Sequence, residues 1–420
     1  MNKKDKNLIE RIIQKNNKIR SKYFYPLLDD AFSEDDLISG IKVLISGQLT
    51  MSKKTRDFEK KFAYKLGKKY AVMVNSGSSA NLLAVFASSN PLRKNRFKSG
   101  DEVLIPALCW STSLWPLVQS GLKPVFVDVD KDTLNVNSDL LVKKISNKTK
   151  VIMLVHVLGN STDVEKIKKI AQRKKIILIE DTCESLGTKF KNKYLGTFGD
   201  FGTYSFYYSH QITSGEGGMI VCDNQDDYEL LCSMRSHGWS RNLKSQKKIE
   251  KKYPNINSKF IFINSGFNLR PTDIIASIGN SQFKRLDKLI KIRRANSLKI
   301  KNRLIKSKKW NNQFSFLKIN SNVTPSLFGF SIFINKKFSK KKKKFLEFLD
   351  NEGVETRPII SGNFLNQPAI KLFKLNKKNQ KFPEAQKVEN CGFFIGLHSK
   401  NITKETLNRL VNILIKIDTI

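Results

Sequence analysis

The sequence predicts an α/β protein with a large, mainly parallel sheet and a smaller α+β unit after it. Apolar segments rich in Val and Ile alternate with helical patterns through the first two thirds of the chain, which is typical of a parallel sheet with helices on both faces. The 420 residues exceed the length at which a single hydrophobic core keeps growing. We therefore expect a helical arm over residues 1–45, a large domain over 46–285 and a small domain over 286–420.

Seven segments of the large domain have the length and composition of buried strands. Helical patterns lie between them, most clearly at Ser79–Ser88, Thr112–Ser120 and Asp163–Lys174, and Asp163 stands in a capping position. Beyond about Gln282 the pattern changes to that of the smaller unit. The expected strands are Tyr70–Asn75, Glu102–Pro106, Pro124–Asp128, Val151–His156, Ile176–Glu180, Thr203–Tyr207 and Met219–Cys222. The smaller unit should contain a basic helix through Asn302, a strand at Leu327–Ile334, a helix at Lys340–Asn351 and a strand at Val354–Pro358.

Composition narrows the class of protein. The apolar fraction of 40% is ample for a buried core, yet no run of about 18 apolar residues predicts a membrane span. The first residues lack an apolar signal core and a cleavage site, so we expect a cytoplasmic protein. Five scattered cysteines are too few for a disulfide scaffold and are expected to be reduced thiols.

The chain is strongly basic. Its 76 Lys and Arg residues outnumber 37 Asp and Glu residues, which gives a net charge of +39. Such a balance raises the question of nucleic acid or an anionic membrane as partner. The lysines are spread along the whole chain in company with Asn and Ile, which indicates a bias in residue usage, so we expect neither partner. A basic protein also attracts smaller polyanions such as a nucleotide diphosphate.

Polar residues follow several of the predicted strands. The turn SGSSAN, with Gly77 and Ser78, comes between a strand and a helix, where backbone N–H groups suit a phosphate. Asp181 follows a buried strand at the edge of the sheet where open α/β folds bind ligands. Trp110 follows another strand as a flat aromatic surface, and Trp115 lies close enough in sequence to be confused with it.

These segments together resemble the sugar-nucleotide aminotransferases of the DegT/DnrJ/StrS group, which use pyridoxal 5′-phosphate (PLP). The similarity extends from about Phe24 to the end of the chain and implies the aspartate-aminotransferase-like fold, known as fold type I. It implies that Asp181 pairs with the pyridine nitrogen and keeps the ring an electron sink. The other cofactor residues that it implies are Gly77, Ser78 and Ser205 at the phosphate, Trp110 on the ring face, Glu184 near the phenolic oxygen and Asn268 on the phosphate of a partner subunit in a homodimer.

The segment GTYSFYYSHQITSGEGG, residues 202–218, departs from that family's pattern. His210 stands where the relatives carry the lysine that binds the PLP aldehyde, and no lysine lies between Thr203 and Gly218. Imidazole cannot form that Schiff base but can move protons, because its ordinary pKa of about 6.5 leaves it mostly neutral at physiological pH. The exchange favours elimination from a sugar over amination of it.

The segments CWSTSLWPLVQSGL, RSHGWSRNL, RPIISGNFL and NCGFF are similar to the 3-dehydratases of this family. That resemblance implies that L-glutamate converts PLP to pyridoxamine phosphate, that His210 takes a proton from the cofactor's methylene carbon, and that the C3 hydroxyl of a nucleotide-linked 4-keto-6-deoxyhexose leaves as water. His237, Arg241 and Asn363 lie in segments that relatives use near the substrate.

Two kinds of histidine-bearing relative exist, and cysteine spacing separates them. One kind acts on a GDP-linked sugar with PLP and glutamate alone, and the other acts on a CDP-linked sugar and carries an iron-sulfur cluster on four cysteines. Cys183 stands where the first ligand would be, but the other positions correspond to about Arg241, Leu243 and Lys251. We therefore expect no metal and no cluster. A sugar aminotransferase with another base, and a regulatory or nucleic-acid-binding protein that kept the fold, are the alternatives.

Overall fold

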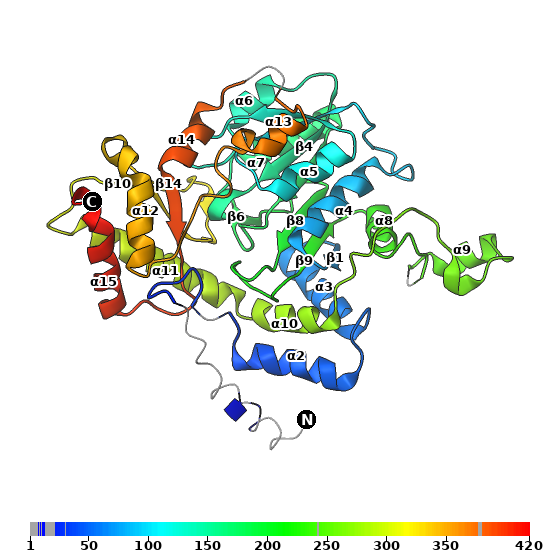
Figure 1. Ribbon diagram of the computed structural model, residues 1–420. Helices are drawn as coiled ribbons and strands as arrows, with labels where there is room; N and C mark the ends of the chain where they lie inside the picture. Colours follow the sequence, from blue (N-terminus) through cyan, green and yellow to red (C-terminus); the bar gives the residue numbers. More distant parts are fainter. Residues whose placement is uncertain are drawn as a thin grey trace.

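The computed structural model describes residues 7, 9, 11, 12, 22–29, 31–241, 243–376 and 380–420. Most of the expected helical arm before residue 22 lies outside these residues, and helix α2 (Glu34–Ser46) forms at the end of the expected arm. Two sheets organise the rest of the chain, a seven-stranded sheet and a four-stranded sheet. In Figure 1 they lie side by side, with the smaller sheet and its helices beside the larger one.

The seven-stranded sheet has the order β1-β9-β8-β5-β4-β2-β3. Strand β9 runs antiparallel to both of its neighbours, and the pairs from β8 to β3 are parallel. The sheet is thus parallel except for one strand. Its members are β1 (Tyr70–Val74), β2 (Glu102–Pro106), β3 (Lys123–Val127), β4 (Thr149–Val155), β5 (Ile177–Asp181), β8 (Phe201–Ser205) and β9 (Gly218–Cys222).

Helices cover both faces of this sheet because successive side chains of each strand point to opposite sides. Val72, Ile105 and Ile179 belong to the core on one face, which is covered by α4 (Gly77–Ser89), α5 (Ser111–Gln119) and α8 (Gln225–Arg235). The opposite face is covered by α3 (Lys53–Leu66), α6 (Ser138–Lys143), α7 (Val164–Lys174) and α10 (Asp273–Phe283).

The four-stranded sheet is antiparallel and has its own core. Its order is β10-β12-β14-β13, and Phe345, Ile395 and Leu414 are among the side chains buried against it. Its elements are α11 (Leu286–Ile305), β10 (Phe314–Phe316), β12 (Phe330–Ile334), α12 (Lys342–Asn351), β13 (Thr356–Arg357), β14 (Gly392–Ile395) and α15 (Lys404–Leu414). A small third sheet contains β6 (Lys189–Phe190), β7 (Lys193–Tyr194) and β11 (Val323–Thr324). Helix α13 (Pro368–Leu372) packs Ile370 into the core of the first sheet, and α14 (Pro383–Cys391) contacts β12 and β14. Helix α9 (Gln246–Lys252) projects from the body (Figure 1).

The fold confirms the predicted α/β class. All seven predicted strands form, each within two residues of its expected bounds, and Asp163 caps α7 by accepting a hydrogen bond from the N–H of Lys166. The basic run begins with a 3-10 turn, Lys336–Lys341, so the helix there starts two residues later than expected. The division at residues 45 and 285 remains our proposal.

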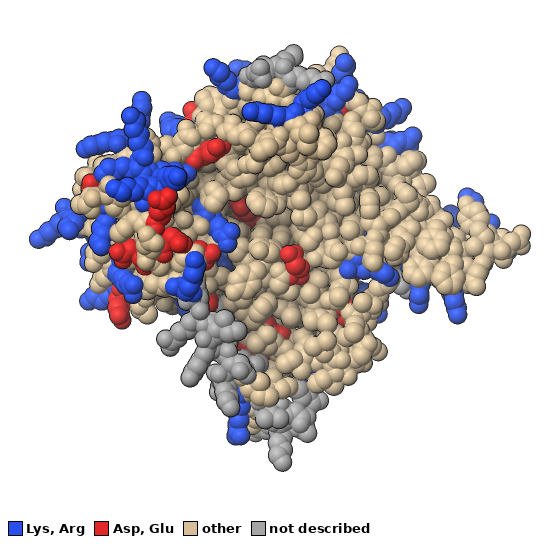
Figure 2. Space-filling view, in the orientation of Figure 1, with Lys and Arg blue, Asp and Glu red and all other residues tan. Residues whose placement is uncertain are grey.

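Charge is unevenly placed on the visible face of the molecule. Figure 2 shows Lys and Arg side chains gathered over the lobe that carries α12 and α15, and few charges over the large sheet. Three lysines of the basic run have local structural partners, since Lys341, Lys342 and Lys344 donate to main-chain carbonyl groups. Within the described part of the chain, no helix is long and apolar enough to cross a membrane.

Asp273 joins two helices behind the large sheet and offers a test of the fold. Its buried carboxylate accepts hydrogen bonds from the N–H groups of Ser52 and Thr55, each 3.1 Å long. We expect Asp273→Ala to lower the free energy of unfolding by about 3 kcal/mol, because it leaves buried donors unpaired. Asp287→Ala, at a side chain that is 64% exposed and paired with Lys65, should cost less than about 1 kcal/mol. Urea denaturation measures the free energy of unfolding of both variants. Equal losses would contradict the structural role that we give to the buried hydrogen bonds of Asp273.

Candidate functional site

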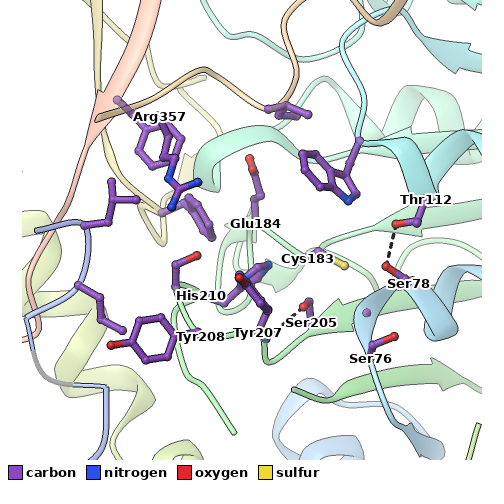
Figure 3. Close-up of a pocket in the computed structure, with 18 of the residues that line it drawn as sticks. Ser76, Ser78, Thr112, Cys183, Glu184, Ser205, Tyr207, Tyr208, His210 and Arg357 are labelled. Atoms are coloured by element: carbon purple, nitrogen blue, oxygen red, sulfur yellow. Dashed lines mark hydrogen bonds between the residues drawn. The ribbon is translucent and has the colours of Figure 1, made fainter. Parts of the chain in front are cut away.

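A cavity of about 710 Å³ opens at the carboxyl edge of the large sheet. Its walls come from the ends of strands β4, β5 and β8, from the starts of α4 and α5, and from residues before and after β13. The segment at 22–28 closes one side of it. Seven of the predicted site residues line this cavity: Gly77, Ser78, Trp110, Asp181, Glu184, Ser205 and His210. Figure 3 labels Ser78, Glu184, Ser205 and His210 among them.

One end of the cavity is a cradle of neutral hydrogen-bond donors. Helix α4 begins here, and Ser76 caps it by accepting a hydrogen bond from the N–H of Ser79. A Cβ atom at Gly77 would lie 2.5 Å from the Cβ of Ser205, so only glycine allows the helix to start this close to β8. Ser78 donates to the hydroxyl of Thr112 over 3.0 Å. Free N–H groups at a helix start with hydroxyls around them bind phosphate well.

Asp181 ends strand β5 in the wall of the cavity and is only 5% exposed. Its Oδ2 accepts hydrogen bonds from Asn81 and Ser113, and its Oδ1 accepts one from the N–H of Cys183. These partners hold the carboxylate in one orientation at the point where the resemblance places the pyridine nitrogen. A buried carboxylate with such partners fits a cationic ring nitrogen.

Two further predicted residues face the same space. Trp110 lines the cavity with 54% of its surface exposed, whereas Trp115 packs against Phe364 and Phe373, so the structure distinguishes the two tryptophans. Burial and the charge of Asp181 raise the pKa of Glu184 to about 7, although its carboxylate accepts a hydrogen bond from the N–H of Leu158. Glu184 therefore exists in both protonation states near neutral pH.

His210 is half-buried on the turn after β8. Its ring meets the edges of Tyr207 and Phe328, with centroids 5.9 and 5.0 Å away, and its Nδ1 is buried without a hydrogen-bond partner. Burial, and then the positive charge of Arg293, lower the pKa of His210 to about 3. Arg293 also donates to the main-chain oxygen of His210 over 3.2 Å. The imidazole is therefore neutral at physiological pH and can accept a proton.

Four predicted residues lie outside the cavity that this one chain forms. Asn268 is exposed and bonds Arg270, and His237 and Arg241 are exposed near the projecting α9. Asn363 is buried, where it accepts from the N–H of Leu365 and donates to Gln386. A role for Asn268 in a partner's site, and substrate roles for the other three, stay predictions.

The cavity also contains residues that the sequence pattern did not single out. Tyr207 and Tyr208 are each 49% exposed beside His210. Arg357, which is 61% exposed and 3.3 Å from Glu355, points its guanidinium into the cavity (Figure 3). Arg357 is the first residue of the segment RPIISGNFL, whose similarity to the 3-dehydratases was the one sequence feature that pointed to this arginine.

The sequence was compared with models of protein families. The model of the DegT/DnrJ/EryC1/StrS aminotransferase family matches residues 32–415. The chain belongs to this family. The matched residues include the start of α4, the end of β5 and the turn after β8, which converge in the cavity.

Family members with high similarity cover nearly the whole chain. A relative from Escherichia coli O55:H7, described as GDP-4-keto-6-deoxy-D-mannose 3-dehydratase, is 38% identical over 385 residues, which are 91% of this chain and 97% of that protein. A Yersinia pseudotuberculosis protein with the same description is 36% identical over 396 residues, 93% of this chain and 98% of the relative.

Solved structures of such dehydratases have the same fold. A histidine-to-asparagine variant of GDP-4-keto-6-deoxymannose-3-dehydratase with bound GDP-perosamine has a TM-score of 0.84 and 36% identity, and the match covers 93% of this chain and all of that one. A GDP-4-keto-6-deoxymannose-3-dehydratase with a trapped PLP-glutamate geminal diamine has a TM-score of 0.81 and 35% identity over 92% of this chain and 99% of that one.

The cysteines of this family member are dispersed. Cys183 lines the cavity, Cys109 and Cys222 are buried, and no disulfide links the five. Among the described residues, no three His, Cys, Asp or Glu side chains gather as a metal site. Independence from an iron-sulfur cluster stays a prediction.

Gly77→Ala tests the phosphate cradle. The added methyl must displace Ser205, and overpacking of this kind typically costs about 1–3 kcal/mol, which corresponds to roughly 5- to 150-fold in a binding constant. We expect the affinity for PLP to fall by about that factor in an absorbance titration. Ser89→Ala, at the other end of the same helix, is the control and should leave the affinity unchanged. Equal affinities for the glycine variant and the wild type would refute the cradle.

Proposed function

We propose that this protein is a PLP-dependent enzyme that removes the C3 hydroxyl of a nucleotide-linked 4-keto-6-deoxyhexose, with L-glutamate as amino donor, in the biosynthesis of a deoxysugar for a surface polysaccharide. The observation that carries the proposal is His210, which stands in place of the family's lysine inside a cavity whose remaining parts suit PLP. Two relatives described as 3-dehydratases match over at least 91% of the chain and support it.

The residues present fit the cofactor. Ser76, Ser78 and the N–H groups at the start of α4 would hold the phosphate, Asp181 would face the ring nitrogen, and Trp110 would cover the ring. Glycine at position 77 leaves the room that a phosphate needs beside Ser205. When bound and aminated by glutamate, the cofactor supplies an electron sink that lets the hydroxyl next to the sugar's ketone carbon leave.

His210 is the proposed base. Its ring is neutral at physiological pH because burial and Arg293 lower its pKa, so it can take up a proton at a ring nitrogen. Among the described residues, Lys22 is the only lysine that lines the cavity. Lys22 is exposed, and a hydrogen bond with Tyr23 raises its pKa, so it is a poor substitute for the family's catalytic lysine. This observation disfavours the aminotransferase alternative.

The substrate is proposed by class, and GDP-4-keto-6-deoxymannose is the first member to test. The two relatives act, by their descriptions, on that sugar, and a structure with 36% identity holds GDP-perosamine. A CDP-linked substrate handled with an iron-sulfur cluster is the runner-up, and the positions Arg241, Leu243 and Lys251 speak against it because none of these side chains ligates iron. A regulatory protein would not need several cofactor-binding residues in one cavity, so their presence together disfavours that alternative.

The assembly and its location are part of the same proposal. We propose a cytoplasmic homodimer in which Asn268 of one subunit reaches the cofactor phosphate of the other. Its exposure, away from the cavity of its own chain, supports this arrangement. No nucleic-acid or membrane partner is proposed.

A substrate panel tests the function. GDP-, CDP-, UDP- and dTDP-linked 4-keto-6-deoxysugars are incubated with the protein, PLP and glutamate, without iron or reductase, and products are read by mass spectrometry. We expect a 3-deoxy-4-keto sugar from one of them, with the GDP-linked mannose derivative as the best substrate. A 4-amino sugar as the main product, or a strict need for an electron donor, would contradict the proposal.

Substitution of His210 tests its role. We expect His210→Asn to lower the dehydration rate by about 10²- to 10⁴-fold, the usual contribution of a general base, because bulk is kept while the base is lost. His210→Lys should dehydrate as poorly and should bind PLP covalently, so that borohydride makes the link permanent and peptide mass spectrometry finds it.

The wild type is the control, and its PLP should remain removable by denaturation after the same borohydride treatment. If His210→Asn dehydrates the correct sugar at the wild-type rate, another group is the base.

A further inference from the structure

The carboxylate of Asp181 accepts hydrogen bonds from two buried side chains. Its Oδ2 accepts a hydrogen bond of 2.8 Å from Asn81 Nδ2 and one of 2.7 Å from Ser113 Oγ. Asn81 is 2% exposed and Ser113 is fully buried. They come from two different helices, α4 and α5, so the carboxylate is fixed from separate directions. Both bonds go to the same oxygen, whereas Oδ1 accepts a hydrogen bond from the N–H of Cys183, 3.1 Å away, and the thiol of Cys183 also hydrogen-bonds this carboxylate.

A third buried residue orients this arrangement. Thr203 lies beside Asp181 in the register of β5 and β8, and its hydroxyl donates to Asn81 Oδ1 over 2.6 Å. An amide has a donor end and an acceptor end, and its neighbours decide which end faces which partner. The hydroxyl of Thr203 contacts the oxygen of Asn81, and the NH₂ group of Asn81 faces Asp181, whose carboxylate accepts from it. Thr203 is fully buried, so solvent water does not compete with its hydroxyl for Asn81.

These contacts hold the carboxylate of Asp181 in one orientation. A carboxylate held in line with a ring nitrogen can accept a hydrogen bond from a proton on that nitrogen, whereas one that has lost its partners can turn away from it.

We propose that Asn81, Ser113 and Thr203, here called the Asp181 clamp, are positioning residues that hold the Asp181 carboxylate in the orientation in which it can bind a protonated ring nitrogen of the cofactor. This inference rests on the proposed function, because it assumes that PLP is the ligand. Asn81 itself lines the cavity, whereas Ser113 and Thr203 lie outside its lining and act through Asn81 or Asp181.

The test uses the full-length protein loaded with PLP whose ring nitrogen is isotopically labelled for NMR. The variants are Thr203→Val, which keeps the shape and removes the hydroxyl, together with Ser113→Ala and Asn81→Leu. We expect the nitrogen signal of each variant to move toward that of unprotonated PLP. We also expect PLP affinity to fall by about tenfold or more in Ser113→Ala and Asn81→Leu, which each remove a hydrogen bond to the carboxylate, and by less in Thr203→Val, which removes a bond to a neutral amide.

Ser78→Ala is the matched control, because Ser78 belongs to the phosphate cradle. It should weaken PLP binding without moving the nitrogen signal, which separates the clamp from a general loss of affinity. Thr203→Val and Ser113→Ala keep the test decisive if Asn81→Leu does not fold, which circular dichroism of the cofactor-free protein reveals.

A nitrogen signal at the wild-type position in both folded variants overturns the inference, whether or not affinity falls, because the contacts would then be structural only. Failure of the proposed function looks different, since it is read on the wild-type protein, either as no binding of PLP or as the wrong product in the substrate panel.

Discussion

The close approach of helix α4 to strands β8 and β9 is the constraint on which the site depends. A Cβ atom at Gly77 would lie 2.5 Å from that of Ser205, and one at Gly218 would lie 2.2 Å from the oxygen of Ser76. Two residues without side chains therefore let the helix begin in contact with the sheet edge. The same approach places the free N–H groups of the helix at one end of the cavity and, one turn later, Asn81 against Asp181.

The sequence was enough to predict the part of the site that is formed by residues directly after parallel strands. Asp181 and the Gly77 turn each follow a strand, and the carboxyl ends of parallel strands meet at one edge, so their proximity could be expected from sequence. The antiparallel course of β9 could not, because a short apolar run has the same composition in either direction. Ser113 and Thr203 were missed for a related reason, since their contacts join segments far apart in sequence.

The protonation state of His210 depends on its surroundings. The ordinary pKa of histidine predicts a mostly neutral ring at physiological pH. Burial and the charge of Arg293 lower the pKa of His210 to about 3, so the ring is neutral over a wider range of pH. Negative charge brought close by a ligand raises the pKa of a histidine. The strength of His210 as a base therefore depends on the charge of what the cavity binds.

Two parts of the cavity can bind anions in different ways, one through neutral donors and the other through cationic side chains. The end formed by α4 and Ser205 offers backbone N–H groups and hydroxyls, whereas Arg357 lies across His210 from it (Figure 3). Arg357 and Lys22 are the only arginine and lysine that line the cavity within the described residues. Neutral donors of fixed geometry suit a phosphate that stays bound, because little rearrangement is needed to hold it. Long cationic side chains at the open side suit anions that enter and leave at every turnover, since their charge attracts from a distance and their contacts re-form each time.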